Sequence, residues 1–112
     1  MTENQFRKIA LGMEGAIERA HMNHPDFRAN NRIFATLRGD GKHGMVVLPL
    51  DDQARFIADA PDAFLPEAGA WGRQGCTRVV LNATDQETVG EAMTLAWRKA
   101  MSSRPGRAKR RR

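Results

Sequence analysis

The sequence predicts a two-layer α+β domain, an antiparallel sheet with helices on one face, in the order α-β-β-β-α-β-β-α. Three observations predict this class. The 112 residues are 41% apolar and 28% charged, which is typical of one soluble globular domain. Apolar residues recur at helical spacing near both ends of the chain. Between these ends lie β-branched segments separated by Gly, Asn and Pro. We expect a single domain over residues 1–103.

The first helix is predicted to begin after Thr2, because Gln5 completes a capping box with it. Residues 16–24 fit either a strand or a helix, and we expect a strand. The apolar residues that repeat at helical spacing in the first helix are Phe6, Ile9, Ala10 and Met13.

A β-hairpin is predicted around Asn30-Asn31, because asparagine tolerates the left-handed backbone that a two-residue turn requires. Its arms are residues 27–29 and 32–37. Strict alternation along the second arm predicts one face made of Ile33, Ala35 and Leu37 and an opposite face made of Phe34 and Thr36.

The glycine-rich segment 39–44 matches G-x-G-x-x-G, but it precedes the β-branched segment 45–48. The dinucleotide-binding motif needs a helix at that place, so we expect a loop that connects two strands. Pro49 ends the second of these strands. Asp51 or Asp52 is expected to cap a second helix that runs through residue 60. The expected inner face of that helix is Ala54, Ile57 and Ala58.

The second half of the chain predicts a short strand near 63–67, an exposed loop over 69–75 and a strand over 77–81. A capping box formed by Thr84 and Glu87 predicts the start of a last helix. The apolar stripe of that helix is Val89, Ala92, Met93, Ala96, Trp97 and Ala100.

Charge is divided unevenly along the chain. Residues 104–112 hold six of the 18 Lys and Arg residues and no acid, whereas the first 103 residues hold 12 cations and 13 acids. We expect the terminal segment to be disordered, because like charges repel. It would attract phosphates without sequence preference, and a purely solubilising role is the alternative. The cations of this segment that we assign to nucleic acid are Arg107, Lys109, Arg110, Arg111 and Arg112.

Several classes of function are disfavoured. No apolar run approaches the ~20 residues that span a bilayer, and the N-terminus does not resemble a signal peptide, so we expect a cytoplasmic protein. The single cysteine, Cys76, is expected to be a buried or half-buried, inert thiol. His21 and His24 lie three residues apart, but an ordinary polar role is favoured over metal binding. We find no catalytic constellation and expect no cofactor or metal.

Two features suit the recognition of a partner. Trp71 and Arg73 lie in a segment with three glycines, and such a pair suits stacking on a base or anchoring a protein. The alternative is that Trp71 covers the core. Arg28 and Arg32 bracket the hairpin turn, where they would contact phosphates or simply be solvated.

Four segments resemble the MmcQ/YjbR family in their order: HPDFR at 24–28, RIFATL at 32–37, PDAF at 61–64 and AWGRQG at 70–75. The resemblance covers residues 5–100 and implies a small two-layer α+β fold. Members often carry a DNA-binding label, which rests on structural likeness to double-wing DNA binders. The polar and aromatic residues that the resemblance implies are His24, Arg28, Trp71, Arg73 and Thr77.

The chain departs from the family pattern in three places. Glu14 stands where a proline is common, Cys76 stands where an aromatic residue is common, and Arg32 replaces a frequent lysine. The lost aromatic residue weakens any stacking platform built around the segment that carries Trp71. His24 and Thr77 are kept as further candidate surface residues.

We expect a monomeric, non-enzymatic DNA-binding protein that contacts phosphates through Arg28, Arg32 and Arg73, with Trp71 beside them. This function requires the arginines to gather beside Trp71 into one cationic surface. One alternative is a protein-interaction module anchored by the segment around Trp71. Another is a small-molecule binder or enzyme, which requires His24, Arg28 and Arg73 to share a cleft.

Overall fold

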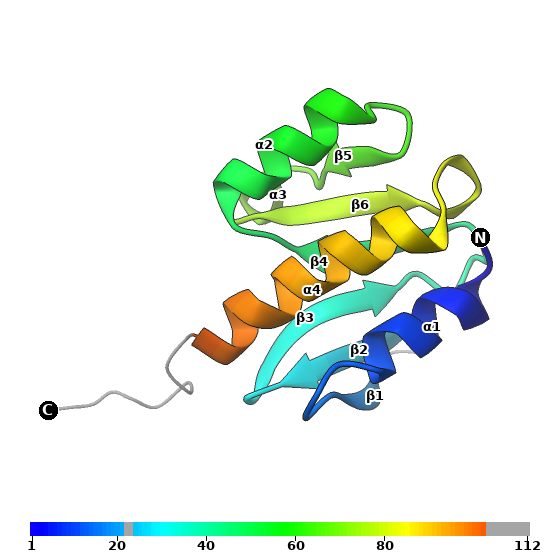
Figure 1. The fold of residues 1–112 in the computed structure, drawn as a ribbon, viewed down its shortest axis with the longest axis vertical. Coiled ribbons are helices and arrows are strands. Elements are labelled where there is room, and N and C mark those ends of the chain that lie inside the picture. Colours follow the sequence, from blue (N-terminus) through cyan, green and yellow to red (C-terminus); the bar gives the residue numbers. More distant parts are fainter. Residues whose placement is uncertain (22–23, 103–112) are drawn as a thin grey trace, which may run out of the picture.

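The computed structural model describes residues 1–21 and 24–102 of the chain. Within them, six strands form one antiparallel sheet with the order β1-β2-β3-β4-β6-β5 (Figure 1). The strands are β1 (Ile17–His21), β2 (His24–Ala29), β3 (Arg32–Leu37), β4 (His43–Val47), β5 (Phe64–Pro66) and β6 (Cys76–Val80). The helices are α1 (Glu3–Leu11), α2 (Leu50–Asp59), α3 (Ala70–Arg73) and α4 (Gln86–Ser102), with a 3-10 turn over Leu81–Ala83.

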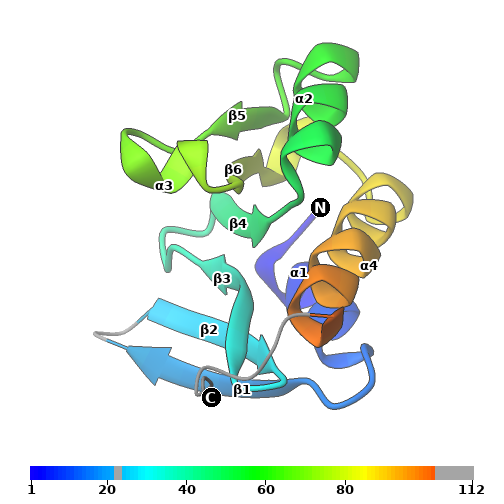
Figure 2. The ribbon, with the colours of Figure 1, turned by 90° about the vertical axis from the view of Figure 1, so that its left-hand side faces the viewer.

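Helices α1, α2 and α4 cover one face of the sheet, whereas α3 lies on the opposite side (Figure 2). The hydrophobic core fills the space between the sheet and the three covering helices. We call the other side of the sheet the open face. The predicted two-layer α+β class is confirmed. The largest fully buried aromatic side chains of the core are Phe6, Phe27, Phe34 and Phe64.

Two elements differ from the predicted order. Four strands precede the second helix, one more than the predicted order counts: residues 24–29, which include the predicted first arm of the hairpin, pair with β1 on one side and β3 on the other. The segment 69–75, predicted as a loop, contains the single turn of α3. That turn is closed by a backbone hydrogen bond from Gln74 to Ala70.

A β-bulge in β3 reverses part of the predicted facing. Phe27 pairs with Ala35, but Arg28 pairs with Ile33, so Phe34 is the extra residue on β3. Phe34 is fully buried, whereas Ile33 is 41% exposed. The predicted grouping of Ile33 with Ala35 is therefore wrong. The bulge lets two consecutive residues enter the core and turns Ile33 to the open face.

Side-chain capping is confirmed at α1 and displaced at α4. Gln5 N–H donates to Thr2 Oγ1, and Thr2 N–H donates to Gln5 Oε1, which completes the predicted capping box. At α4, Asp85 rather than Thr84 accepts from Thr88 N–H at 2.8 Å. The predicted cap is thus wrong by one residue. The predicted stripe of α4 is confirmed, with Val89, Ala92, Met93, Ala96 and Ala100 buried and Trp97 half-buried.

The start of α2 differs from the prediction. The helix begins at Leu50 with Pro49 at the N-cap position, and no side chain caps it. The predicted cap by Asp51 or Asp52 is therefore wrong. Both carboxylates lie in the first turn instead, where they complement the positive end of the helix dipole.

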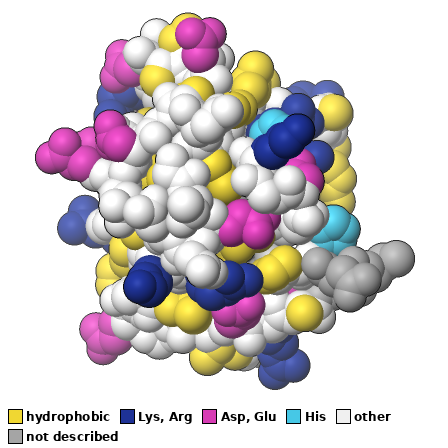
Figure 3. Space-filling model, turned by 90° about the vertical axis from the view of Figure 1, so that its right-hand side faces the viewer, with side chains coloured by type: hydrophobic (Ala, Val, Ile, Leu, Met, Phe, Trp, Pro, Cys, Tyr) yellow, Lys and Arg dark blue, Asp and Glu magenta, His cyan; other side chains and the backbone are white. Residues whose placement is uncertain are grey.

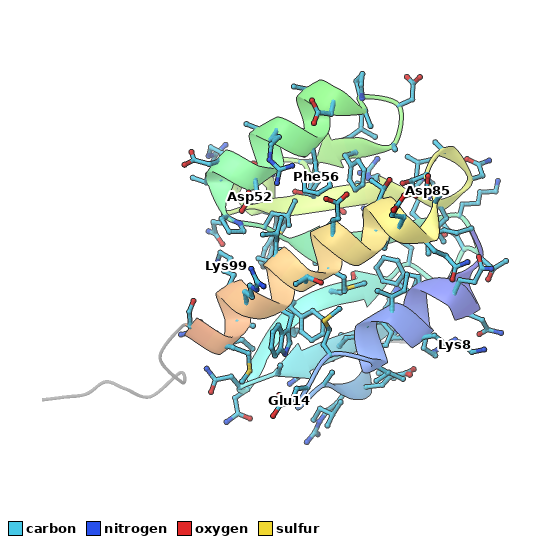
Figure 4. The ribbon with its side chains drawn as sticks, in the orientation of Figure 1. Lys8, Glu14, Asp52, Phe56, Asp85 and Lys99 are labelled. Atoms are coloured by element: carbon cyan, nitrogen blue, oxygen red, sulfur yellow. The ribbon has the colours of Figure 1, made fainter. Side chains whose placement is uncertain are left out.

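The buried face of α2 is shifted by one residue from the predicted face. Gln53 and Phe56 are buried, whereas Ala54 and Ala58 are exposed. Phe56 packs against Phe64 with ring centroids 5.1 Å apart, beneath α2 in Figure 4. An aromatic ring buries far more apolar area than an alanine, so it sets the orientation of the helix.

Both predicted connections around β3 are confirmed. Asn30 and Asn31 have φ values of 57° and 60°, as the two-residue hairpin turn requires. The glycine-rich segment connects β3 to β4, and Asp40 Oδ1 accepts from the N–H groups of Lys42 and His43. Asp40 Oδ2 also lies 2.8 Å from His43 Nδ1.

The sheet is narrowly joined at its centre. Strands β3 and β4 pair only between residues 35–37 and 44–46. The first half of β3 turns away from the end of β4, and α4 packs across both halves of the sheet (Figure 2). We call the paired residues 35–37 and 44–46 the central seam. An opening is therefore left beside the seam, with α4 behind it.

The predicted disordered segment 104–112, with all of its assigned cations, lies outside the described residues. In the part of the chain that the structure describes, no helix combines the length and the apolar character needed to span a membrane.

Candidate nucleic-acid interface

Three adjoining hollows lie on the open face, and Thr36 of β3 borders all of them. Their volumes are about 600, 710 and 330 Å³. The hollow of about 600 Å³ occupies the opening beside the central seam. We call it the Trp71 groove, and its lining includes Arg28, Arg32, Ile33, Val47, Trp71 and Lys99.

The Trp71 groove has a cationic rim and an apolar base. Arg28 and Arg32 come from the two strands of the hairpin, and Lys99 comes from the C-terminal half of α4 (Figure 4). None of the described residues that line this groove is acidic. Ala96 and Ala100 form its base, because both line the groove and are buried in the core.

Asp26 fixes the orientation of Arg28. The Nε and Nη2 atoms of Arg28 donate to the two carboxylate oxygens of Asp26 at 2.9 and 3.2 Å. Asp26 is buried, whereas Arg28 is about one-third exposed. The hydrogen bond with Asp26 raises the pKa of Arg28 further, so the guanidinium keeps its charge. The pair offsets part of this charge and holds the guanidinium where two hollows meet.

Glu67 holds two further arginines beside the third hollow. Both of its carboxylate oxygens accept from Arg38 Nη2 at 2.9 Å. Its Oε1 atom also accepts from Nε and Nη2 of Arg78 at 3.2 and 3.0 Å. One carboxylate between two guanidinium groups leaves a local excess of positive charge.

Charge is distributed asymmetrically over the fold. Of the 12 cations in the first 103 residues, five border the three hollows, together with two of the 13 carboxylates. At the end of the molecule shown in Figure 3, basic and acidic side chains are interspersed instead. The expected cationic surface beside Trp71 is formed only in part: Arg28 and Arg32 line the Trp71 groove, but Asp26 offsets the charge of Arg28, and Arg73 borders none of the three hollows.

Trp71 is both exposed and firmly placed. Its side chain is 68% exposed, so the alternative in which it covers the core is wrong. Gly72 lies so close to Glu67 that an added Cβ would sit 2.0 Å from the Glu67 carbonyl oxygen. The buried amide of Gln53 donates to the carbonyl oxygens of Gly72 and Cys76 at 3.0 and 3.3 Å. These contacts fix the short helix that presents the indole.

The exit from α3 is fixed by Gly75 and Thr77. Gly75 has a φ of 104°, and an added Cβ would lie 2.0 Å from the carbonyl oxygen of Leu48. The hydroxyl of Thr77 donates to the Gly75 carbonyl oxygen at 2.9 Å, and Thr77 is 0% exposed. Its prediction as a surface residue is therefore wrong. Thr77 pairs with Val46 on the side of the sheet that faces the helices, and it supports the backbone behind Trp71.

Cys76 is buried, as predicted, and it lies where the Trp71 groove meets the third hollow. Burial raises the pKa of its thiol, and the charge of Glu67 raises it further. The side chain is therefore a neutral thiol at neutral pH, which suits an apolar lining rather than a nucleophile.

Of the two remaining predicted site residues, His24 borders a hollow and Arg73 does not. His24 lines the hollow of about 710 Å³ together with Arg28. Arg73 is exposed on α3 but borders none of the three hollows. The cleft shared by His24, Arg28 and Arg73 that a small-molecule site would require is therefore not formed by the described residues.

The charged residues that border the hollows and were not predicted as site residues include Arg38, Glu67, Arg78 and Lys99. Arg38 directly follows β3 and Arg78 lies in β6, and these strands flank β4, so only the strand order reveals that the two arginines meet. A signal for Lys99 was available, because it lies three residues after Ala96 and next to Ala100 at the edge of the predicted apolar stripe.

Among the described residues, no group of three or more His, Cys, Asp or Glu side chains is placed to bind a metal ion. No protein-family model and no curated protein matches this chain.

A solved structure with a similar fold is the crystal structure of Deinococcus radiodurans protein DR2400, which contains a DUF419 domain. The similarity has a TM-score of 0.76 and covers 90% of this chain and 79% of that chain, at 13% sequence identity. The two proteins therefore share a fold.

Proposed function

We propose that the chain is a member of the MmcQ/YjbR group and that it binds DNA without catalysing a reaction. Two findings support the membership. Four segments of the sequence, over residues 24–28, 32–37, 61–64 and 70–75, resemble the group in the same order. The fold is shared with a DUF419-domain protein, and DUF419 is related to this group.

The observation that carries the DNA-binding proposal is the composition of the Trp71 groove. Three cations surround it, none of its described lining residues is acidic, and an exposed Trp71 stands at its side. Cations bind phosphate oxygens, and an exposed indole stacks on bases. Three of the 12 cations of the first 103 residues thus line one groove, beside an exposed aromatic side chain.

The roles of the cations follow from their positions. Arg28, already oriented by Asp26, and Arg32 would contact phosphates along the rim of the groove. Arg73, exposed on α3 beside Trp71, would contact a phosphate outside the groove. The cations of residues 104–112 would add attraction that is independent of sequence.

Charge-neutralising variants test this proposal. In one double variant, Arg32→Gln and Lys99→Gln remove two charges from the groove and leave the pair of Arg28 with Asp26 intact. Binding of labelled DNA, measured by fluorescence anisotropy over a salt series, should weaken. The magnitude of the log–log salt slope should fall by about 1–2, since each lost phosphate contact contributes about 0.7–0.9.

The matched control is the double variant Arg55→Gln and Arg98→Gln, which removes the same charge from exposed positions on α2 and α4. Its affinity should change much less than that of the groove variant. Equal weakening by both pairs would mean that DNA responds only to net charge, and the assignment of the groove would then be wrong.

A protein-interaction module is the second candidate. The observation in its favour is a pair of exposed aliphatic side chains on the open face. Ile33 of β3 is 41% exposed and Leu65 of β5 is 38% exposed, and β4 and β6 lie between these two strands. Exposed aromatic and aliphatic side chains of this kind anchor protein partners. A partner that is lost on Trp71→Ala while DNA affinity stays unchanged would favour this candidate.

A further inference from the structure

We propose that the Trp71 groove receives one unpaired nucleotide, so that the protein prefers single-stranded DNA to duplex DNA. This inference rests on the proposed DNA binding and adds the form of DNA that the site accepts. It follows from three properties of the groove: its apolar base, its cationic rim and the exposed indole at its side, which a fixed backbone carries.

The depth of the groove does not suit a phosphate backbone alone. Its base is made of alanines from α4, and Ile33 and Val47 contribute apolar walls. A phosphate gains nothing from such a surface, because burial beside apolar groups removes its hydration. A base does gain, since it is planar and largely apolar on its faces. The volume of about 600 Å³ lies within the range of pockets that hold small organic ligands.

The cationic rim of the groove suits the phosphate of a nucleotide. Arg28, Arg32 and Lys99 surround the same opening, and none of the described lining residues opposes them with a carboxylate. An occupant with an apolar plane and an attached anion therefore fits both parts of the groove. The side chains of Asn31, Thr36 and Gln74 also line it and offer amide and hydroxyl groups to the edge of a base.

The backbone that carries Trp71 is fixed before any ligand arrives. Gly72 rests against the backbone of Glu67, and Gln53 holds the carbonyl group of Gly72. An exposed aromatic ring on such a support can stack on a base with little loss of conformational entropy. Duplex DNA keeps its bases stacked inside the helix, so it offers a base to the groove only after an unfavourable extrusion.

The test compares the full chain with two probes, a labelled 12-nucleotide oligodeoxythymidylate and a labelled 12-base-pair duplex, at one fixed salt concentration. The single strand should bind more tightly. Trp71→Ala should weaken single-strand binding by about 5- to 150-fold, the equivalent of stacking one base, and should change duplex binding by less than about twofold. Trp71→Phe should restore most of the single-strand affinity, because a smaller ring still stacks.

The matched control is Leu50→Ala, which truncates another exposed apolar side chain, at the start of α2. It should leave both affinities unchanged. Because Trp71 is largely exposed, its replacement should also leave the thermal unfolding midpoint unchanged, which separates lost stacking from lost folding.

Each outcome decides between the two proposals. Duplex binding as tight as single-strand binding, or single-strand binding that is insensitive to Trp71→Ala, would overturn the nucleotide site and leave DNA binding intact. Absence of binding to both probes at low salt would overturn the proposed function itself.

Discussion

Gly72 shows how one residue places the exposed indole of the site. A Cβ at this position would lie 2.0 Å from the carbonyl oxygen of Glu67, inside any permitted contact distance. We expect Gly72→Ala to lower the free energy of unfolding by about 1–3 kcal/mol, because the turn of α3 must move away from the backbone of Glu67. Urea denaturation followed by circular dichroism measures this change.

Gly90 provides the control for this substitution. It also lies in a helix, α4, but an added Cβ would meet nothing within 4 Å. Gly90→Ala should therefore raise the free energy of unfolding by about 0.5–1 kcal/mol through the better helix propensity of alanine. The same sign of change for both substitutions would contradict the assigned role of Gly72.

At the scale of elements, the hairpin between β2 and β3 depends on two left-handed asparagines. Asn31 is exposed and has a φ of 60°. We expect Asn31→Gly to leave the free energy of unfolding unchanged or slightly higher, because glycine adopts this conformation without strain. Asn31→Val should lower it by about 1–2 kcal/mol, since a β-branched residue is strained there. Thermal unfolding of the two variants provides the comparison, and equal midpoints would contradict the turn assignment.

The connection between β3 and β4 carries a pH-dependent contribution to stability. The hydrogen bond with His43, together with the backbone N–H of Lys42, holds the pKa of Asp40 well below its usual range. A carboxylate whose pKa is lowered in the folded state stabilises the fold above its unfolded pKa of about 4, and this stabilisation is lost as the pH falls below that value.

Asp40→Asn tests this contribution. The wild-type chain should be more stable than the variant by about 0.5–1 kcal/mol near pH 6, a modest figure because the pair is largely exposed to solvent. The difference should shrink as the pH is lowered from 4 towards 2. Urea denaturation of both proteins at each pH measures it, and a difference that stays constant over this range would show that the charge of Asp40 has no part in it.

The elements that were predicted correctly depend on short-range chemistry. The capping box of Thr2 with Gln5 and the turn at Asn30-Asn31 involve residues within three positions of each other, so their spacing is visible in the sequence. The bulge at Phe34 was missed because alternation assumes one residue per pleat, and the extra residue is revealed only by pairing with β2. The cap at Asp85 was missed because Thr84 offers the same chemistry one position earlier.

At the scale of the whole molecule, five cations border the hollows of the open face and six lie in residues 104–112. A chain that ends at residue 103 should fold with an unchanged free energy of unfolding, because the core formed by the described residues lies entirely before that point. Its log–log salt slope for duplex DNA should be smaller in magnitude by up to about 5, as the loss of six cations allows.

Residual binding by the shortened chain decides the role of the folded domain. A weaker but measurable affinity at low salt is expected, carried by the open face. A shortened chain that binds no DNA even at low salt would place all of the affinity in the terminal cations, and the groove would then have another role.

The candidate site was less predictable than the fold because it combines distant segments. Arg28, Arg32 and Trp71 were selected from the sequence, and they do line one groove. Their neighbours Arg38 and Arg78 became part of the same face only through a strand order in which β6 follows β4. Net charge along the chain could not reveal this face, because the balancing carboxylates lie mostly elsewhere on the fold.

The central seam also has a dynamic consequence. Three residue pairs and one further backbone hydrogen bond, from Arg38 to His43, connect β3 to β4, whereas β4 and β6 are joined by five residue pairs. Local opening at the seam would break few backbone hydrogen bonds and would leave each three-stranded half of the sheet intact. Helix α4 would remain packed against both halves. Amide protons along the seam should therefore exchange with deuterium faster than those between β4 and β6. The opening beside the central seam can therefore widen transiently while the rest of the hydrophobic core stays shielded from solvent.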